Sequence, residues 1–247
     1  MSARLDLTMV ALGLARSRTH AQAAIRAGQV RVAGQVVTRP AQPVEGPEIE
    51  VANQDRFVSR AAHKLLGALA VAPITVPSRV LDAGASTGGF TQVLLEAGAG
   101  RVYAVDVGHG QLAPGLRSDP RVVVRERLNL RNLTLTDLES EPVGLVVGDV
   151  SFISLTLLLE RLFAVLAPGG SALLLVKPQF EVGRRGLDDH GLVRSPELRR
   201  EAVDRVIAAG AALGWRAAWQ AESRLPGESG NREYFVNFVG ADVGGGG

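Results

Sequence analysis

Short apolar runs alternate with amphipathic stretches through most of this chain, and that alternation restricts the fold more than any other feature. Four runs rich in aliphatic and β-branched residues cover positions 79–84, 101–107, 145–152 and 171–178. Amphipathic stretches cover 86–98, 153–167 and 195–213. Buried parallel strands read as continuous apolar runs and need helical crossovers between them. We therefore predict an α/β fold with a doubly wound, mostly parallel, Rossmann-like sheet, closed by an antiparallel pair at 215–225 and 233–239.

Composition excludes several classes of protein. The chain has 247 residues, 46% of them hydrophobic, which suits one large domain and one small one. No apolar run approaches the roughly 20 residues of a membrane span, and the first residues lack the apolar stretch of a secretory signal. Because the sequence contains no cysteine, a disulfide framework, a thiolate metal site and a cysteine nucleophile are all excluded. We expect a cytoplasmic protein.

The first 40 residues form a basic region with its own pattern of elements. They hold six arginines and one aspartate, a net charge of +5, which leaves −3 for the other 207 residues because the whole chain carries +2. A loose helical stripe, expected to face inward, consists of Leu5, Val10, Leu12 and Leu14. Ser17 as N-cap and Gly28 as C-terminal stop predict a second helix over 18–27. Alternating valines around Gly34 predict a hairpin, and a further strand is expected at 49–51.

This basic region resembles the S-four type of RNA-binding domain. The resemblance covers about 35 residues, from RLDLTMVALG to RVAGQVV, and includes the order I-x-x-G-x-V-x-V-x-G. A basic oligomerisation module is the alternative. Arginines along one edge suit a phosphate backbone, and the candidate RNA-binding residues are Arg4, Arg16, Arg18 and Arg26. We expect a small α+β RNA-binding domain at 1–52, a linker at 53–60, the α/β domain at 61–240 and a disordered tail at 241–247.

A glycine-rich turn joins the first strand of the α/β region to a helix. It reads Asp82-Ala-Gly84-Ala-Ser86-Thr-Gly88-Gly89. This spacing fits neither the nicotinamide fingerprint nor the P-loop. It resembles motif I of S-adenosylmethionine-dependent methyltransferases, in which a helix N-terminus faces the cofactor. The next strand ends in an acidic residue suited to ribose hydroxyls, and an asparagine farther on is placed near the adenine. The candidate cofactor-binding residues are Asp82, Gly84, Ser86, Thr87, Gly88, Asp106 and Asn129.

Lysine is almost absent from this arginine-rich chain. Only Lys64 and Lys177 occur among 27 basic residues. Arginine cannot lose its proton at a working pH, whereas a buried lysine can, although two lysines could also survive by drift. Asp149 and Lys177 end two predicted strands, so both are expected at the ligand crevice along the carboxyl edge of the sheet. Glu233 begins the last predicted strand.

The order Lys64, Asp149, Lys177, Glu233 is similar to the catalytic tetrad of FtsJ-like ribose 2′-O-methyltransferases. Together with the N-terminal region, residues 3–240 resemble the TlyA family of ribosomal RNA methyltransferases, historically also labelled haemolysins. The resemblance rests on phrases such as SRAAHKL, LDAGASTGGF, GDVSFISL, VKPQFE and GNREYFV.

The resemblance implies methyl transfer from S-adenosylmethionine to a cytidine 2′-hydroxyl in ribosomal RNA, with ribosomal subunits as partners. The large subunit is favoured, and some relatives modify both. We expect Lys177 to accept the hydroxyl proton, Asp149 to position Lys177, and Glu233 with Lys64 to orient the group, without a metal. A base could stack on Phe152 or Phe180, and packing of these rings in the core is the alternative.

The sequence is also compatible with two other functions. One is a membrane-active haemolysin, which would need a lipid-seeking amphipathic helix or barrel. The other is a catalytically inert ribosome-assembly factor, which would bind RNA without transferring a methyl group. The sequence leaves open the nucleotide, the subunit, the oligomeric state and the arrangement of the domains.

Overall fold

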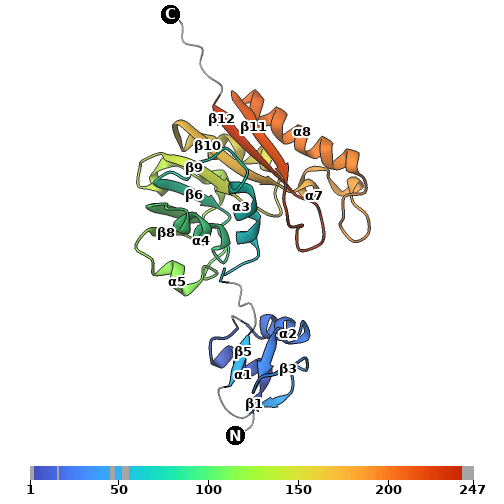
Figure 1. Cartoon of the computed structure of the whole chain (residues 1–247). Helices are drawn as coiled ribbons and strands as arrows, with labels where there is room; N and C mark the ends of the chain where they lie inside the picture. Colours follow the sequence, from blue (N-terminus) through green and yellow to red (C-terminus); the bar gives the residue numbers. More distant parts are fainter. Residues whose placement is uncertain (1–2, 16, 45–47, 52–55, 241–247) are drawn as a thin grey trace, which may run out of the picture. The chain divides into compact units, whose positions relative to one another are not determined.

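The computed structural model describes residues 3–15, 17–44, 48–51 and 56–240, and the chain divides into two compact units, Met1–Arg56 and Phe57–Gly247 (Figure 1). The tail expected at 241–247 and residues 53–55 of the expected linker lie outside the described residues. Of its described residues, Arg56 falls in the first unit and 57–60 belong to the second unit. There Phe57 is buried in the core, and the Val58 amide donates to the Gln92 side chain.

The first unit packs two helices against short antiparallel strands. Its helices are α1 (Leu5–Ala11) and α2 (Arg18–Arg26). Its strands are β1 (Ala3–Arg4), β2 (Val30–Val32), β3 (Gln35–Val37), β4 (Pro43–Val44) and β5 (Ile49–Val51). The strands form a three-stranded sheet in the order β3-β2-β5 and a separate β1-β4 pair. The Ser17 hydroxyl accepts from the His20 amide at 3.2 Å, as expected of the N-cap of α2.

The inward face of α1 differs from the predicted one. Leu5 and Met9 are fully buried, whereas Val10 and Leu12 are 37% and 50% exposed. Because residues four positions apart lie on the same side of a helix, Met9 faces the core together with Leu5. The helix also ends at Ala11, before Leu12.

The second unit is a seven-stranded sheet in the order β11-β12-β10-β9-β6-β7-β8. The strands are β6 (Arg79–Ala83), β7 (Arg101–Val105), β8 (Val122–Arg125), β9 (Val143–Gly148), β10 (Leu166–Val176), β11 (Trp215–Glu222) and β12 (Tyr234–Gly240). The first five are parallel, and β12 runs antiparallel to both β10 and β11. The predicted doubly wound, mostly parallel sheet and its antiparallel closure are confirmed.

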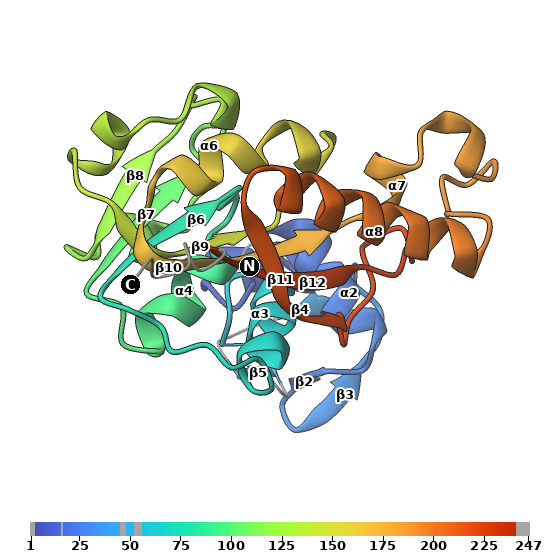
Figure 2. The same cartoon turned by 90° about the horizontal axis from the view of Figure 1, so that it is seen from above.

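Helices cover both faces of this sheet (Figure 2). The α-helices are α3 (Ala61–Leu69), α4 (Gly89–Glu96), α5 (Pro114–Arg117), α6 (Leu159–Ala164), α7 (Pro178–Glu181) and α8 (Pro196–Ala212). Residues of α3 and α4 share one buried cluster with Leu175 and Phe235, and residues of α6 and α8 share the other with Val176 and Val236. Alternate residues of each strand therefore point to opposite cores, as a pleated strand requires.

Two predicted elements end earlier than expected, and both changes matter for the site. The run at 145–152 is a strand only as far as Gly148, so Asp149 and the residues after it lie in a loop. The helix expected over 153–167 is a 3-10 turn, Leu155–Leu157, followed by α6, because strand β10 already begins at Leu166.

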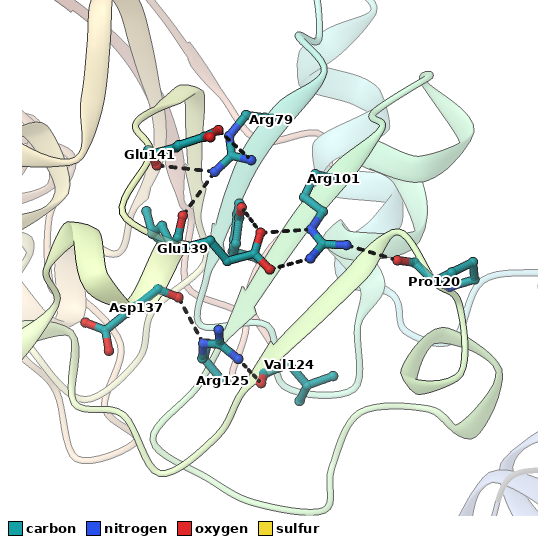
Figure 3. A network of polar contacts seen from close by, with 10 residues as sticks. Arg79, Arg101, Pro120, Val124, Arg125, Asp137, Glu139 and Glu141 are labelled. Atoms are coloured by element: carbon teal, nitrogen blue, oxygen red, sulfur yellow. Dashed lines mark hydrogen bonds and ion pairs between the residues drawn. The ribbon is translucent and has the colours of Figure 1, made fainter.

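Several arginines of the sheet form hydrogen bonds and ion pairs with other segments of the same unit (Figure 3). Arg101 donates two hydrogen bonds to the Glu139 carboxylate, and the buried Tyr103 hydroxyl donates a third at 2.8 Å. Arg101 thereby lowers the pKa of Glu139. Arg79 donates to the Leu138 carbonyl at 3.0 Å and stacks over the Tyr103 ring. These contacts tie the segment after β8 to the first residues of β6 and β7.

Candidate functional site

Two charged pairs lie at the carboxyl edge of the sheet. In the first, Lys177 Nζ is 2.6 Å from Asp149 Oδ1, and both side chains are largely buried. The two atoms are in contact, but their approach is bent away from hydrogen-bond geometry. Asp149 follows β9 and Lys177 follows β10, which are neighbouring parallel strands, so the pairing follows from the strand order.

The second pair joins residues 169 positions apart. Lys64 on α3 donates to Glu233 Oε2 at 2.6 Å, and the two side chains are 8% and 2% exposed. Glu233 stands just before β12, whose Tyr234 is paired with Val176 of β10. Glu233 and Lys177 therefore occupy facing positions one residue beyond the last pair. The structure brings the four predicted tetrad residues to one edge of the sheet as two separate ion pairs.

The glycine-rich turn approaches the neighbouring strand end closely. Gly84 has φ +86°, and a Cβ there would lie 3.0 Å from the Asp149 carbonyl oxygen. Gly88 has φ +98°, and a Cβ there would overlap Leu112 and Leu116. Glycine is therefore required at both positions, at Gly84 by the strand end beside it and at Gly88 by core packing.

Asp106 closes the turn from the next strand. Its two carboxylate oxygens accept from the Ser86 amide at 2.8 Å and from the Gly108 amide at 2.7 Å. A carboxylate oxygen has a second lone pair, so Asp106 keeps acceptor capacity for a ligand. Asn129 accepts from the Arg131 amide at 3.0 Å through Oδ1, which leaves its NH₂ group as a donor.

A cavity of about 530 Å³ lies beside these residues. Among the predicted cofactor-binding residues, those that line it are Gly84, Ser86, Asp106 and Asn129. Asp149 of the first ion pair lines it as well. Asp82, Thr87 and Gly88 do not. The sequence analysis did not identify several further lining residues, including Gly108, Gln111, Leu128, Ser151 and Ile153. The one signal that the sequence carries for them is their position a few residues after the end of a strand.

Asp82 lies behind the turn, fully buried. One of its oxygens accepts from the Thr91 hydroxyl at 2.6 Å, and the other has no hydrogen-bond partner. Burial raises the pKa of Asp82 to about 7, and the nearby Asp149 charge contributes to the same shift. Its contact with α4 makes Asp82 a support of the turn.

The loop after Asp149 carries two residues beside the first ion pair. Ser151 Oγ accepts a hydrogen bond from Lys177 Nζ at 2.6 Å. Phe152 is 90% exposed with φ +66°, and its ring lies 5.4 Å from that of Phe180. A large apolar side chain in solvent, on a backbone conformation that is unfavourable for it, is typical of a binding surface.

In the first unit, two of the predicted RNA-binding arginines contact an internal carboxylate. Arg4 makes two hydrogen bonds to the fully buried Asp6, and Arg18 makes one at 3.0 Å. The Arg4 and Arg18 side chains are still 42% and 55% exposed, so part of each side chain is accessible to solvent. Arg26 is exposed on α2, and Arg16 lies outside the described residues.

The described part of the chain offers neither a membrane-spanning helix nor a cluster of metal-ligating side chains. None of its helices is both long enough and apolar enough to span a bilayer. No group of three or more histidine, aspartate or glutamate side chains there is arranged to hold a metal ion.

Known proteins match both units. Residues 57–239 match the FtsJ-like methyltransferase family, and residues 3–48 match the S4 domain. The chain is 48% identical, over 95% of its length and 88% of the relative's, to the 16S/23S rRNA (cytidine-2'-O)-methyltransferase TlyA of Mycobacterium tuberculosis. It is 38% identical to Hemolysin A of Brachyspira hyodysenteriae, over 96% of this chain and 99% of that protein.

A solved structure agrees with these matches. The structure of a candidate hemolysin from Streptococcus thermophilus aligns with a TM-score of 0.77 at 36% identity, covering 98% of this chain and 89% of that one. The predicted family is thus confirmed by sequence and by fold. The chain belongs to the TlyA family, in which an S4 domain precedes an FtsJ-like methyltransferase domain.

Proposed function

We propose that this protein transfers a methyl group from S-adenosylmethionine to the 2′-hydroxyl of a cytidine in ribosomal RNA. The large subunit is the first candidate substrate and the small subunit the second. The observation that carries the proposal is the Lys177–Asp149 ion pair at the cavity beside the glycine-rich turn. The similarity to the TlyA of M. tuberculosis supports the same nucleotide and the same atom.

The cavity suits the proposed cofactor. Gly84 lines the cavity, and Asp106 offers acceptor oxygens suited to two ribose hydroxyls. Apolar walls from Leu128 and Ile153 would cover a flat base, with the Asn129 amide as a nearby donor. S-adenosylmethionine would supply a methyl group on a positively charged sulfur.

Lys177 is the proposed proton acceptor. A ribose hydroxyl is a weak nucleophile until its proton is removed or strongly polarised. Lys177 can take that proton if it is held partly neutral, or if it acts late, when the oxygen has begun to bond to carbon. Asp149 holds the Lys177 side chain at the site, and the Lys64–Glu233 pair is proposed to orient the nucleotide. Alignment of the reacting atoms would supply much of the rate.

The RNA contacts are assigned to both units. The exposed Phe152 ring, beside Phe180, is proposed to stack on the base of the target nucleotide once that base leaves its helix. The exposed parts of Arg4, Arg18 and Arg26 in the S4 domain are proposed to contact phosphates of a structured RNA region.

The test is transfer of labelled methyl from S-adenosylmethionine to large subunits, small subunits and free ribosomal RNA, each assayed separately. The expected product is a 2′-O-methylcytidine in one or both particles. Lys177→Arg should bind the cofactor normally and lose methyl transfer by at least about 100-fold, because arginine does not act as a base. Retained transfer in this variant would rule out proton acceptance by Lys177. RNA binding by the wild-type protein without methyl transfer would favour the inert assembly factor.

A further inference from the structure

Ser151 accepts the only hydrogen bond that Lys177 Nζ, the proposed base, donates among the described residues. Its hydroxyl oxygen lies 2.6 Å from Lys177 Nζ in hydrogen-bond geometry, and Ser151 lines the cavity and is exposed. The ion pair between Lys177 and Asp149 is as short but is not aligned as a hydrogen bond. Asp149 therefore supplies charge, while Ser151 supplies direction.

Direction matters because Nζ is tetrahedral. Besides its bond to Cε, the nitrogen has three positions, each taken by a proton or by the lone pair. A neutral base must aim its lone pair at the hydroxyl proton that it receives. An ion pair alone allows the group to rotate, whereas an aligned hydrogen bond fixes one position and thus limits where the others can point.

The loop that carries Ser151 is anchored at both ends. The Asp149 amide donates to the Ala83 carbonyl at 3.1 Å. At the other end, Glu181 accepts from the Leu155 amide at 2.8 Å and from the Ser154 hydroxyl. Glu181 is buried on α7, the helix that begins directly after Lys177. The segment bearing the base and the loop bearing Ser151 are thus tied together, so their relative position is held before a substrate binds.

We propose that Ser151 is a positioning residue for methyl transfer, which orients Lys177 Nζ toward the ribose 2′-hydroxyl. The inference rests on the proposed function. In the step that it serves, the 2′-oxygen forms a bond to the methyl carbon while the carbon–sulfur bond breaks and sulfur keeps the electron pair. The 2′-hydroxyl proton passes to Lys177 Nζ. Ser151 neither gains nor loses a proton.

The experiment compares single-turnover methylation of ribosomal subunits by the full-length protein and its variants. Ser151→Ala is expected to slow transfer by about 10- to 100-fold, the scale of a misdirected catalytic group. The affinity of Ser151→Ala for the cofactor should stay within about two-fold of wild type, because the hydrogen bond that is lost joins Ser151 to Lys177 and not to the cofactor. Ser151→Thr keeps the hydroxyl and should restore most of the rate. Ser118→Ala, which removes an exposed hydroxyl bonded to the Gly115 carbonyl, is the matched control.

A double variant separates positioning from a general structural effect. Added to Lys177→Met, the change Ser151→Ala should slow the residual transfer by less than about two-fold, because Ser151 acts only through the lysine. If Ser151→Ala slows transfer in the Lys177→Met background by the same factor as in wild type, the inference is overturned. A wild-type rate in Ser151→Ala alone would also overturn it. Either result would leave the proposed function intact. Absence of 2′-O-methylation by the wild-type protein would instead reject the proposed function, and the role of Ser151 with it.

Discussion

Replacing Asp82 by asparagine should remove a pH-dependent weakness from the core of the methyltransferase unit. Burial raises the pKa of Asp82 from 3.8 to about 7. A carboxyl group whose pKa is raised by folding favours the folded state in its neutral form. Its contribution is complete below pH 3.8 and is lost as the pH rises through 7. A shift of about three pKa units corresponds to about 4 kcal/mol of unfolding free energy, spread over that interval.

The expected result is a difference between Asp82→Asn and wild type that depends on pH. Asparagine keeps an oxygen for the Thr91 hydroxyl but cannot ionise. The unfolding free energy of the variant, relative to wild type, should therefore increase by about 4 kcal/mol between pH 4 and pH 8. We predict the change with pH and not the absolute difference in stability. The NH₂ group of the asparagine would take the place of the Asp82 oxygen that has no hydrogen-bond partner, and burying an unpaired donor has its own cost at every pH.

Urea unfolding followed by tryptophan fluorescence is a suitable assay. The two tryptophans of the chain, Trp215 and Trp219, both lie on β11 in the same unit as Asp82. Asp119→Asn is the control with the opposite sign, because Arg121 lowers the pKa of Asp119 and its stabilisation is lost as the pH falls. A difference for Asp82→Asn that stays constant within about 1 kcal/mol from pH 4 to pH 8 would refute the assignment of a buried, neutral carboxyl.

Three further variants test the turn, the cofactor site and the S4 domain. Gly84→Ala should destabilise the protein by at least about 1 kcal/mol more than Gly98→Ala in urea unfolding; both glycines have positive φ, but only Gly84 would meet a neighbouring backbone, and equal losses would contradict this reading. Asp106→Asn should weaken S-adenosylmethionine binding about ten-fold by calorimetry, since hydrogen bonds to a charged group contribute about 1.5–3 kcal/mol; unchanged affinity would remove Asp106 from the site. Asp6→Asn should destabilise the first unit by about 3 kcal/mol, because it replaces the buried charged acceptor of the hydrogen bonds from Arg4 and Arg18 by a neutral amide. Hydrogen exchange of backbone amides in that unit measures this loss, and the contribution of Asp6 should persist into mild acid because Arg4 lowers its pKa; protection equal to wild type would count against the pairing.

Local sequence patterns were sufficient for the succession of strands and helices in the second unit, though not for all their bounds, and for the edge of the sheet where the candidate site lies. Apolar runs identified the parallel strands, and the polar residues that follow them, Asp106, Asp149 and Lys177, are found at the carboxyl edge. Glycine spacing identified the turn before α4. These features depend on residues close together in the chain, where periodicity and backbone preference act directly.

Contacts between distant residues had to come from the tertiary structure. No local pattern tells Lys64 to pair with Glu233 rather than Asp149, because that choice depends on β12 lying beside β10 and on its register. The burial of Asp82 against Thr91, away from the cavity, likewise depends on how separate segments pack. The same is true of the contact of Ser151 with Lys177. The physical reason is that periodicity determines which face of an element is buried, while strand order and register, set by packing of the whole sheet, decide which side chains come within bonding distance.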